Sequence, residues 1–545
     1  MQMKTLFQVS AIASALMLVG CGGDIKIEPT VNDNSVNNSN NTTTPPVEPT
    51  DENLCASYGD GDNLKQGSMT TDGDCSYGLS FASKSIEINE DLTLAALPND
   101  GVHIFDSALQ VGQDCDTTTS CSIDTDGPTL TVEAGATVAF RSGEALIRIG
   151  RGANIDAEGT IDNPITFTST TAISHLDVVG KGPSPFGDWA GIVINGLGIT
   201  DQCTDAERDG GTCNAESEGD GSFYGGNDNA DNSGVIKFAK INYAGSGPID
   251  GGDGNDFNSL LLNSVGSGTE IDYIHIHQGY DDGIEFFGGA VDIKHIVVTE
   301  NQDDAIDIDA GWQGKGQYIF ITHGPAEYDG ETSHMGNHGF ETDGKKGTTS
   351  TQAPVSTTQL ANITFIGSDE VSVRDGDPSR AVKFDDGIQA TYYNALFVKP
   401  TLVQIPVLDS DGNSTGSFED DGCVVFSGDG QINASANSFN NTVLACAQDF
   451  VAGDTAVFDD ADTDSPGQTR AQWLAQGTDV ESVGAITVLQ SDGIRADSAS
   501  FSASPAASLP AGMEAAAFIG AVDYTDTSSD WYNWVNTALT AAEND

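Results

Sequence analysis

Short runs of alternating apolar and polar residues recur along most of this chain, and between residues 270 and 322 they recur at a fixed interval. The positions that return after 22 residues are Asp281 and Asp303, Asp282 and Asp304, Ile284 and Ile306, and Phe286 and Ile308. Two upstream series follow the same step, namely Ile274, Ile296 and Tyr318, and Ile276, Val298 and Phe320. Alternation with a period of two predicts strands with one buried face, and the helical period of 3.6 is absent.

A repeat of about 22 residues that holds short strands and glycine or aspartate turns predicts an all-β fold, the parallel β-helix. In that fold each coil stacks its residues on those of the previous coil. We place the coils at residues 127–464, with loops leaving them around 200–232, 323–360 and 404–420, where the repeat is lost. Residues 54–126 are expected to form an N-terminal cap and residues 465–545 a small, partly helical C-terminal cap that covers the last coil.

The first twenty residues carry Lys4 and then an apolar run too short to span a bilayer, which is typical of a signal peptide. The run ends in Leu-Val-Gly-Cys and resembles the lipobox of bacterial lipoprotein precursors. The resemblance implies cleavage before Cys21, acylation of Cys21 and, with Gly22 next, an outer-membrane location. An ordinary secretory signal is the alternative. Polar residues 21–53 are expected to be a disordered tether between the lipid and the folded body.

Export makes disulfides plausible, and eight cysteines remain after Cys21. We favour four sequence-local pairs among the 105 connectivities that eight cysteines allow. The pairs are Cys55 with Cys75, Cys115 with Cys121, Cys203 with Cys213, and Cys423 with Cys446. None has the C-x-x-C spacing that zinc sites favour.

Charge narrows the range of partners. The chain has 82 acidic residues against 21 lysines and arginines, a net charge of −61, with 38% hydrophobic residues for a core. Such a protein repels nucleic acids and attracts cations such as calcium. We therefore exclude nucleic-acid binding.

Several phrases of the sequence resemble one family. They are "TLTVEAGATVAF", "DWAGIVINGLG", "DNSGVIKFAKINYAG", "DDGIEFFGGAVDIKHIVV" and, near the end, "AAFIGAV" and "DWYNWV". They are similar to those of exported right-handed parallel β-helix proteins, often lipoproteins, of marine and other Gram-negative bacteria. The resemblance implies a right-handed coil and an exported protein. It carries no established activity and therefore no catalytic residues.

The repeated aspartates allow a structural and a chemical interpretation. In the structural one, the Asp pairs begin turns and accept backbone N–H bonds, and calcium at Asp281, Asp282, Asp303 and Asp304 relieves their repulsion. In the chemical one, "YDDGIEF", "QDDAIDI" and "THG" resemble motifs of polygalacturonase-type hydrolases, which implies Asp282, Asp303 and Asp304 as acid and base. Two departures weigh against it: His323 follows Asp304 by less than a coil, and Arg374 is a poor match for the substrate-binding basic segment.

The histidines predict no further functional site. His275 and His277 are expected to face outward without forming a ladder, and His334 and His338 to lie in a solvated loop. A lyase that uses calcium and a basic residue is a third, weaker hypothesis. We therefore expect an outer-membrane lipoprotein, facing the periplasm or the cell surface, that binds a polysaccharide or a surface protein without catalysis. A polygalacturonase-like glycoside hydrolase is the main alternative.

Overall fold

A computed structural model describes most of the chain after residue 52. The described residues are 53–119, 121–184, 187–246, 256–346, 352–373, 378–403, 405–408, 414–419, 421–426, 434–451, 457–458 and 467–542. The predicted signal peptide, Cys21, the tether and Arg374 lie outside them, so those predictions stay predictions. No helix within the described ranges is long and apolar enough to cross a membrane.

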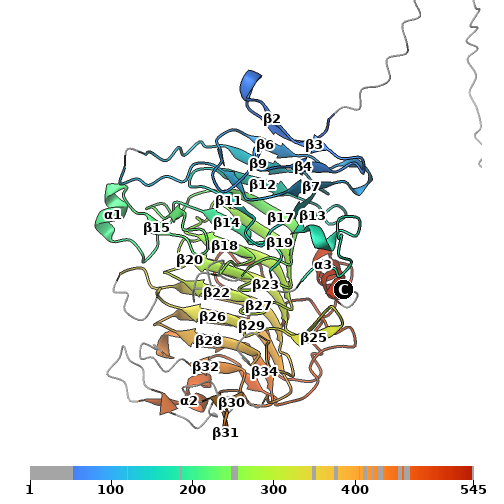
Figure 1. Ribbon diagram of the computed structural model, residues 1–545. Helices are drawn as coiled ribbons and strands as arrows, with labels where there is room; N and C mark the ends of the chain where they lie inside the picture. The colour runs from blue at the N-terminus through green and yellow to red at the C-terminus, as the bar shows by residue number, and fades with distance from the viewer. Residues whose placement is uncertain are drawn as a thin grey trace, which may run out of the picture. The chain divides into compact units, whose positions relative to one another are not determined.

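Two parallel sheets wind around one apolar core, which confirms the predicted all-β parallel β-helix (Figure 1). The ten-stranded sheet contains β5 (Glu87–Ile88), β8 (Leu109–Val111), β11 (Leu146–Ile149), β14 (Gly191–Asn195), β18 (Leu260–Asn263), β20 (Ile284–Phe287), β22 (Ile306–Asp309), β26 (His338–Asp343), β28 (Arg380–Asp385) and β32 (Val424–Phe426). Each of these strands pairs in parallel with the next one of the sheet, one coil further along.

The second sheet has 17 strands. They are β3 (Ser68–Met69), β4 (Cys75–Tyr77), β6 (Leu92–Leu94), β7 (Val102–Phe105), β9 (Thr129–Val132), β10 (Thr137–Phe140), β12 (Asn154–Glu158), β13 (Ile165–Ser169), β17 (Gly234–Asn242), β19 (Glu270–His277), β21 (Ile293–Thr299), β23 (Lys315–Thr322), β27 (Thr357–Ile366), β29 (Gln389–Lys399), β33 (Ser438–Asn440), β34 (Val443–Cys446) and β37 (Glu481–Ser482). Because β5 to β8 already belong to the two sheets, the coil begins before residue 127, where we had expected only a cap.

Small hairpins and helices leave the coil at its corners. The hairpins are β1 (Ser57–Tyr58) with β2 (Lys65–Gln66), β15 (Ala215–Glu216) with β16 (Phe223–Tyr224), β24 (Pro325–Tyr328) with β25 (Glu331–His334), β30 (Ile405–Leu408) with β31 (Ser414–Glu419), and β35 (Val457–Phe458) with β36 (Gln468–Thr469). The α-helices are α1 (Asp205–Gly210), α2 (Arg470–Leu474) and α3 (Asp530–Ala542).

Register follows the predicted interval with one exception. Ile274 pairs with Ile296, and Ile284 with Ile306, as the spacing predicts. In the next coil Ile296 pairs with Ile319 rather than with Tyr318, so that coil has one residue more. The third members of both upstream series, Tyr318 and Phe320, were therefore placed one position too early.

Tyr318 instead belongs to a column of left-handed residues that bend the long strands of the second sheet. The column consists of Phe238, Tyr273, His295, Tyr318, Asn362, Asn394 and Asn441, with φ between 47° and 62°. A left-handed backbone costs about 1–2 kcal/mol for a residue with a side chain. Stacking of the outward rings offsets this cost, since the ring centroids of Tyr273 and His295 are 4.2 Å apart.

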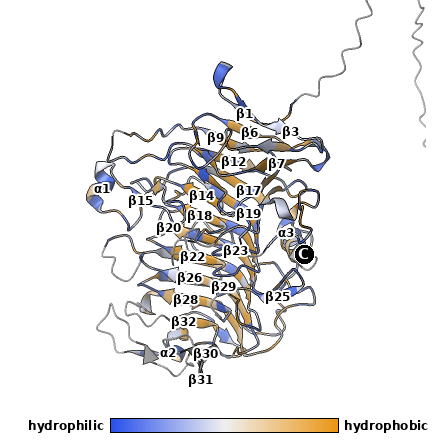
Figure 2. Cartoon of the chain, in the orientation of Figure 1, coloured by the Kyte–Doolittle hydropathy of each residue, from blue (hydrophilic) through white to orange (hydrophobic). Residues whose placement is uncertain are grey.

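The interior of the coil is apolar and partly aromatic, and many of the strands around it have the hydrophobic colour in Figure 2. Phe140 stacks on Trp189 at 4.7 Å and Phe286 on Trp312 at 4.2 Å, and both tryptophans are fully buried. At the C-terminal end of the coil, Trp473 of α2 packs against Phe426, Phe439 and Phe450. This helix covers the last coil as expected.

The rest of the C-terminal segment does not cover the end of the coil, contrary to our expectation. It runs back along the flank: Asn441 donates to the Ser504 carbonyl, Asn362 donates to the Phe518 carbonyl, and Trp534 of α3 packs on Phe238. We call residues 484–542 the strap. Outward side chains such as Val297 and Phe320 are apolar and lie on the flank of the coil. Only a segment that runs beside the coil can bury them, which favours the lateral position of the strap.

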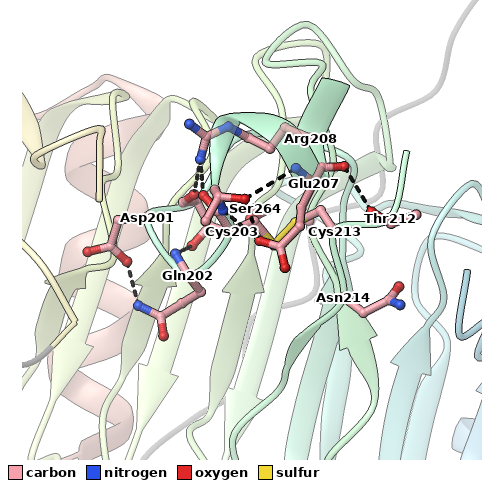
Figure 3. The surroundings of a disulfide bond; sticks show 12 residues. Asp201, Gln202, Cys203, Glu207, Arg208, Thr212, Cys213, Asn214 and Ser264 are labelled. Atoms are coloured by element: carbon pink, nitrogen blue, oxygen red, sulfur yellow. Dashed lines mark hydrogen bonds between the residues drawn. A yellow bond between two sulfur atoms is a disulfide. The ribbon is translucent and has the colours of Figure 1, made fainter. Parts of the chain in front are cut away.

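The four predicted disulfides are present. The first three close local loops, and Cys423–Cys446 joins the start of β32 to β34. Figure 3 shows Cys203–Cys213 beside α1, where the buried Arg208 guanidinium donates to the carbonyl groups of Thr200 and Cys203. These bonds brace the excursion near residues 200–226 internally, and apolar packing of Cys203, Cys213 and Tyr224 joins it to the ten-stranded sheet.

We predict that Trp534→Ala loosens the strap without unfolding the coil. Removing a buried tryptophan costs about 3–5 kcal/mol, and Trp534 is 3% exposed against the aromatic column. Amide hydrogen exchange is expected to accelerate in α3 and the outer strands while β20 stays protected. The control is Asn533→Ala, whose side chain is exposed on the same helix. Unchanged amide exchange in α3 would contradict the assignment of Trp534 as a contact that holds the strap on the coil.

Candidate functional site

A row of charged side chains follows the outer face of the ten-stranded sheet. Glu285, Asp307, Glu341 and Lys383 occupy the same register position in β20, β22, β26 and β28. Their neighbours Ile284, Ile306 and Phe340 point inward and are fully buried. The local sequence pattern thus places three carboxylates on three adjacent coils, about 5 Å apart along the axis.

These carboxylates line a pocket of about 240 Å³ together with residues from the turns before each strand and from two loops. Its lining consists of Glu218, Asp256, Asp281, Asp282, Glu285, Asp303, Asp304, Asp307, Glu341 and Lys346. All four predicted calcium ligands are among them, as are the three hydrolase candidates. We call this cavity the acidic pocket.

The turn aspartates hold the coils together through backbone bonds. Asp282 Oδ1 accepts the backbone N–H of Asp304 at 3.1 Å, and Asp304 Oδ1 accepts the backbone N–H of His338 at 2.6 Å. Asn258 takes the equivalent place one coil earlier, where its Oδ1 accepts the backbone N–H of Asp282. The pairs therefore begin turns and bridge coils, as the structural interpretation states.

The same carboxylates come close enough to share cations. In each of two trios, Asp281 with Asp282 and Asp303, and Asp282 with Glu285 and Asp307, the nearest oxygens lie within 4.8 Å of one another. Asp282 belongs to both trios. Asp307 Oδ1 is buried and has no hydrogen-bond partner. A buried carboxylate oxygen without a donor is unfavourable unless a cation contacts it.

Burial and crowding oppose ionisation here. Burial first, and neighbouring carboxylates second, raise the pKa of Asp282, Glu285 and Asp307 well above the ordinary range. Burial raises the pKa of Asp309, at the end of the same strand as Asp307, to about 6, although Lys346 opposes the shift. Without a bound cation, the pocket therefore retains protons.

A third cluster consists of Asp304, His338 and Glu341. His338 Nδ1 lies 2.8 Å from Asp304 Oδ1 and 3.5 Å from Glu341 Oε2. Burial and the Glu341 charge raise the pKa of Asp304 well above its ordinary value. Burial also acts to raise the pKa of Glu341, but hydrogen bonds from Asp304 and His338 outweigh it, so that pKa falls. Asp304 thus holds the proton beside an ionised Glu341.

The lysines of this face remain protonated. Lys346 Nζ lies 3.2 Å from Asp309 Oδ2, and Lys383 forms ion pairs with Glu341 and Asp385. Burial acts to lower the pKa of both lysines, but the surrounding carboxylates outweigh it and raise the pKa well above the ordinary range. Both amines therefore carry a positive charge near neutral pH while the pocket holds no cation.

His323 does not line the acidic pocket, and its short spacing from Asp304 already counted against the hydrolase interpretation; it is buried, and its Nδ1 lies 2.8 Å from Ser379 Oγ. One histidine prediction was wrong. His338, which we had placed in a solvated loop, begins β26 and is 4% exposed. The excursion that carries β24 and β25 lengthens this coil, so the residue in register with Asp304 comes later than a fixed interval predicts.

His275 and His277 form no ladder, as predicted, since they pair with Val297 and Thr299 in the next coil. Both side chains are buried, and both contact the Thr299 hydroxyl.

The sequence interpretation missed six pocket residues, which are Glu285, Asp307, Glu341, Glu218, Asp256 and Lys346. The signal for the first three was present in "GIEF", "AIDI" and "GFET", where an acidic residue follows an inward apolar residue and precedes another buried residue. Lys346 lies beyond the strands and carries no periodic signal.

We predict that chelator-treated protein loses stability as the pH rises. Because folding raises the pKa of Asp282, Glu285 and Asp307, the native state keeps protons that the unfolded chain releases near pH 4. The free energy of unfolding therefore falls from about pH 4 through pH 6 and above. Urea denaturation at several pH values measures this, and Asp307→Asn should flatten the dependence. Glu158→Gln, at an exposed carboxylate on β12, should not.

Comparison with known proteins agrees with the fold. The model of a pectate-lyase-like β-helix domain family matches residues 106–475, which is more than half of the chain and includes the whole acidic pocket. No curated protein and no solved structure matches the chain. Given this match and the stacked parallel strands, the chain belongs to the pectate-lyase-like β-helix domain family.

Proposed function

We propose that the protein binds carboxylated polysaccharides through calcium ions held in the acidic pocket. The observation that supports this most directly is the pair of overlapping carboxylate trios around Asp282, with an unpartnered oxygen on Asp307. The protein does so without catalysis, from a lipid anchor at Cys21, as an outer-membrane module that faces the periplasm or the cell surface.

Calcium fits this donor set better than other common metals. It takes six to eight oxygen ligands in flexible geometry, whereas zinc and copper favour nitrogen and sulfur. The two trios offer only carboxylate oxygens, and they share Asp282, so two neighbouring ions fit the same cluster. Calcium removes the repulsion that otherwise keeps these groups protonated.

The same ions explain how so acidic a protein attracts an acidic glycan. A chain with net charge −61 repels polyuronates, and the ionised carboxylates of the acidic pocket strengthen the repulsion. A bound calcium ion with open positions coordinates carboxylates of the polysaccharide and reverses the local charge. The β-helix family and the row along the coil axis support an extended ligand.

The lysines and aspartates that could catalyse cleavage of a glycan are held by other contacts. Lys346 forms an ion pair with Asp309, and Lys383 forms ion pairs with Glu341 and Asp385, so both amines are held by carboxylates rather than placed as a base for elimination. Asp282 and Asp304 accept backbone N–H bonds that hold the turns. Each therefore has a structural role that hydrolysis does not require.

A glycoside hydrolase is the second candidate, because one observation favours it. Asp304 keeps its proton beside the ionised Glu341, and His338 fixes its orientation. A protonated carboxylic acid in a pocket with other carboxylates is what general-acid cleavage of a glycosidic bond needs.

We predict that calcium stabilises the protein and that Glu285→Gln weakens this effect. Glutamine keeps an oxygen that accepts the Asn258 amide but lacks the charge that calcium needs. Calcium affinity measured by titration calorimetry should fall about tenfold, and the calcium-dependent rise of the melting temperature should shrink. Glu158→Gln should leave both unchanged. Equal calcium affinity in Glu285→Gln and the native protein would place calcium elsewhere.

We further predict calcium-dependent retention on polygalacturonate or alginate without product. The protein is incubated with each glycan, with calcium or with chelator, and sedimentation, reducing ends and unsaturated ends are recorded. Retention that needs calcium and is lost in Glu285→Gln supports the binding module. New reducing ends that are absent with Asp304→Asn would contradict the binding module and support the glycoside hydrolase.

A further inference from the structure

Lys346 is the one cation among the described residues that line the acidic pocket. Its Nζ lies 3.2 Å from Asp309 Oδ2 and 4.1 Å from the centre of the Phe287 ring. Its backbone N–H donates to Asp201 Oδ2 at 3.0 Å, and the backbone N–H of Asp201 donates to the Ala310 carbonyl group. Both the backbone and the charged end of this lysine are therefore fixed at the pocket.

The two carboxylate trios of the pocket lie at different distances from this ammonium group. The strand trio consists of Asp282, Glu285 and Asp307, and the turn trio of Asp281, Asp282 and Asp303. The ammonium group contacts Phe287 and Asp309. Each of these two residues comes two positions after an acidic member of the strand trio on the same strand. Two residues of a strand span about 7 Å, so the ammonium group lies about one such step from the strand trio.

The turn trio is further from Lys346. Asp281 and Asp303 lie in the turns before β20 and β22. Each comes six residues before the strand residue that Lys346 contacts. The Coulomb interaction falls with distance, and about 0.1 M salt screens exposed charges beyond about 10 Å. Lys346 therefore acts more strongly on an ion in the strand trio than on an ion in the turn trio.

We propose that Lys346 is a built-in competitor of calcium that makes the two calcium positions of the acidic pocket unequal. The turn trio binds the first ion, and the strand trio binds the second ion more weakly. The ammonium group already supplies positive charge beside Glu285 and Asp307, so a calcium ion gains less there than it gains between carboxylates alone. This inference rests on the proposed function, because it requires calcium in the pocket.

The weaker position governs when the glycan binds. The strand trio supplies Glu285 and Asp307 of the row along the coil axis, which is the face that an extended ligand follows. Calcium sites of extracellular modules have dissociation constants of about 10⁻⁴–10⁻³ M, and we expect the second ion in this range. Glycan retention then follows the calcium concentration of the surroundings, while the first ion stays bound.

The test is titration calorimetry of the full chain with calcium, after chelator treatment and at constant ionic strength. The native protein should bind calcium in two steps. Lys346→Met removes the charge but keeps an unbranched side chain, and it should lower the dissociation constant of the weaker step about tenfold while the tighter step stays within about twofold. Lys345→Met removes the neighbouring charge, which lies outside the pocket lining, and should change neither step by more than about twofold.

Two further variants separate charge from packing. Lys346→Arg keeps the charge, so its weaker step should stay closer to the native one than that of Lys346→Met. Combining Lys346→Met with Asp309→Asn removes both members of the ion pair. Because one positive and one negative charge are then lost together, the weaker step should return toward the native dissociation constant.

The chelator-treated protein provides a test that does not need calcium. Without its internal counter-ion, the pocket repels itself more strongly, so Lys346→Met should lower the melting temperature at neutral pH by about 1–2 °C. Lys345→Met should not. An equal melting temperature in Lys346→Met and the native protein would contradict the role of Lys346 as a counter-ion.

The calcium results distinguish this inference from the proposed function. Binding in two unequal steps with an unchanged weaker step in Lys346→Met would overturn the inference and leave the proposed function intact. A single step, two equal steps in the native protein, or an equal gain in Lys346→Met and Lys346→Arg would do the same. A native protein that binds no calcium would overturn both.

Discussion

Everything in this protein depends on the stacking of equivalent side chains on successive coils, about 4.8 Å apart. Inside the coil this spacing is favourable, since Ile274 meets Ile296 and Phe286 meets Trp312 in a dry core. Outside, the same spacing brings like charges together, as in the row of Glu285, Asp307 and Glu341. The fold cannot separate these carboxylates without losing register, so the charge must be neutralised by protons or by cations.

Two cavities of this protein differ in the sign of the charge that they hold. The acidic pocket concentrates negative charge on the outer face of a sheet, where adjacent coils repeat an acidic position. A second cavity, lined by turns near the N-terminal end of the coil, contains Arg151, whose guanidinium donates to the carbonyl groups of Cys115, Cys213 and Gly225. The difference arises from position: a sheet face repeats its side chains, whereas a turn presents mainly backbone oxygens to whatever side chain enters it.

The parallel β-helix and the stacked aspartates could be predicted from the sequence. Period-two alternation indicates strands, and an Asp pair that recurs after 22 residues indicates that equivalent residues stack on neighbouring coils. The disulfides followed from local spacing. What the pattern could not reveal was irregular length: one added residue shifted Tyr318 to the bend, and the excursion before β26 moved His338 into register with Asp304. A fixed interval fails wherever a loop is inserted. The strap could not be predicted for another reason. A helical segment near the end of the chain has the same sequence pattern whether it covers the end of the coil or its flank.

The strap changes the topology of folding. In a solenoid most contacts join one coil to the next, so contact order is low and assembly can propagate along the chain. Trp534 on Phe238 is an exception, because it closes a loop that includes the coils between them. A chain synthesised from its amino end would complete its coils while the aromatic column on their flank still faced solvent. The last step of maturation is therefore expected to be docking of the strap, at a rate set by loop closure rather than by coil growth.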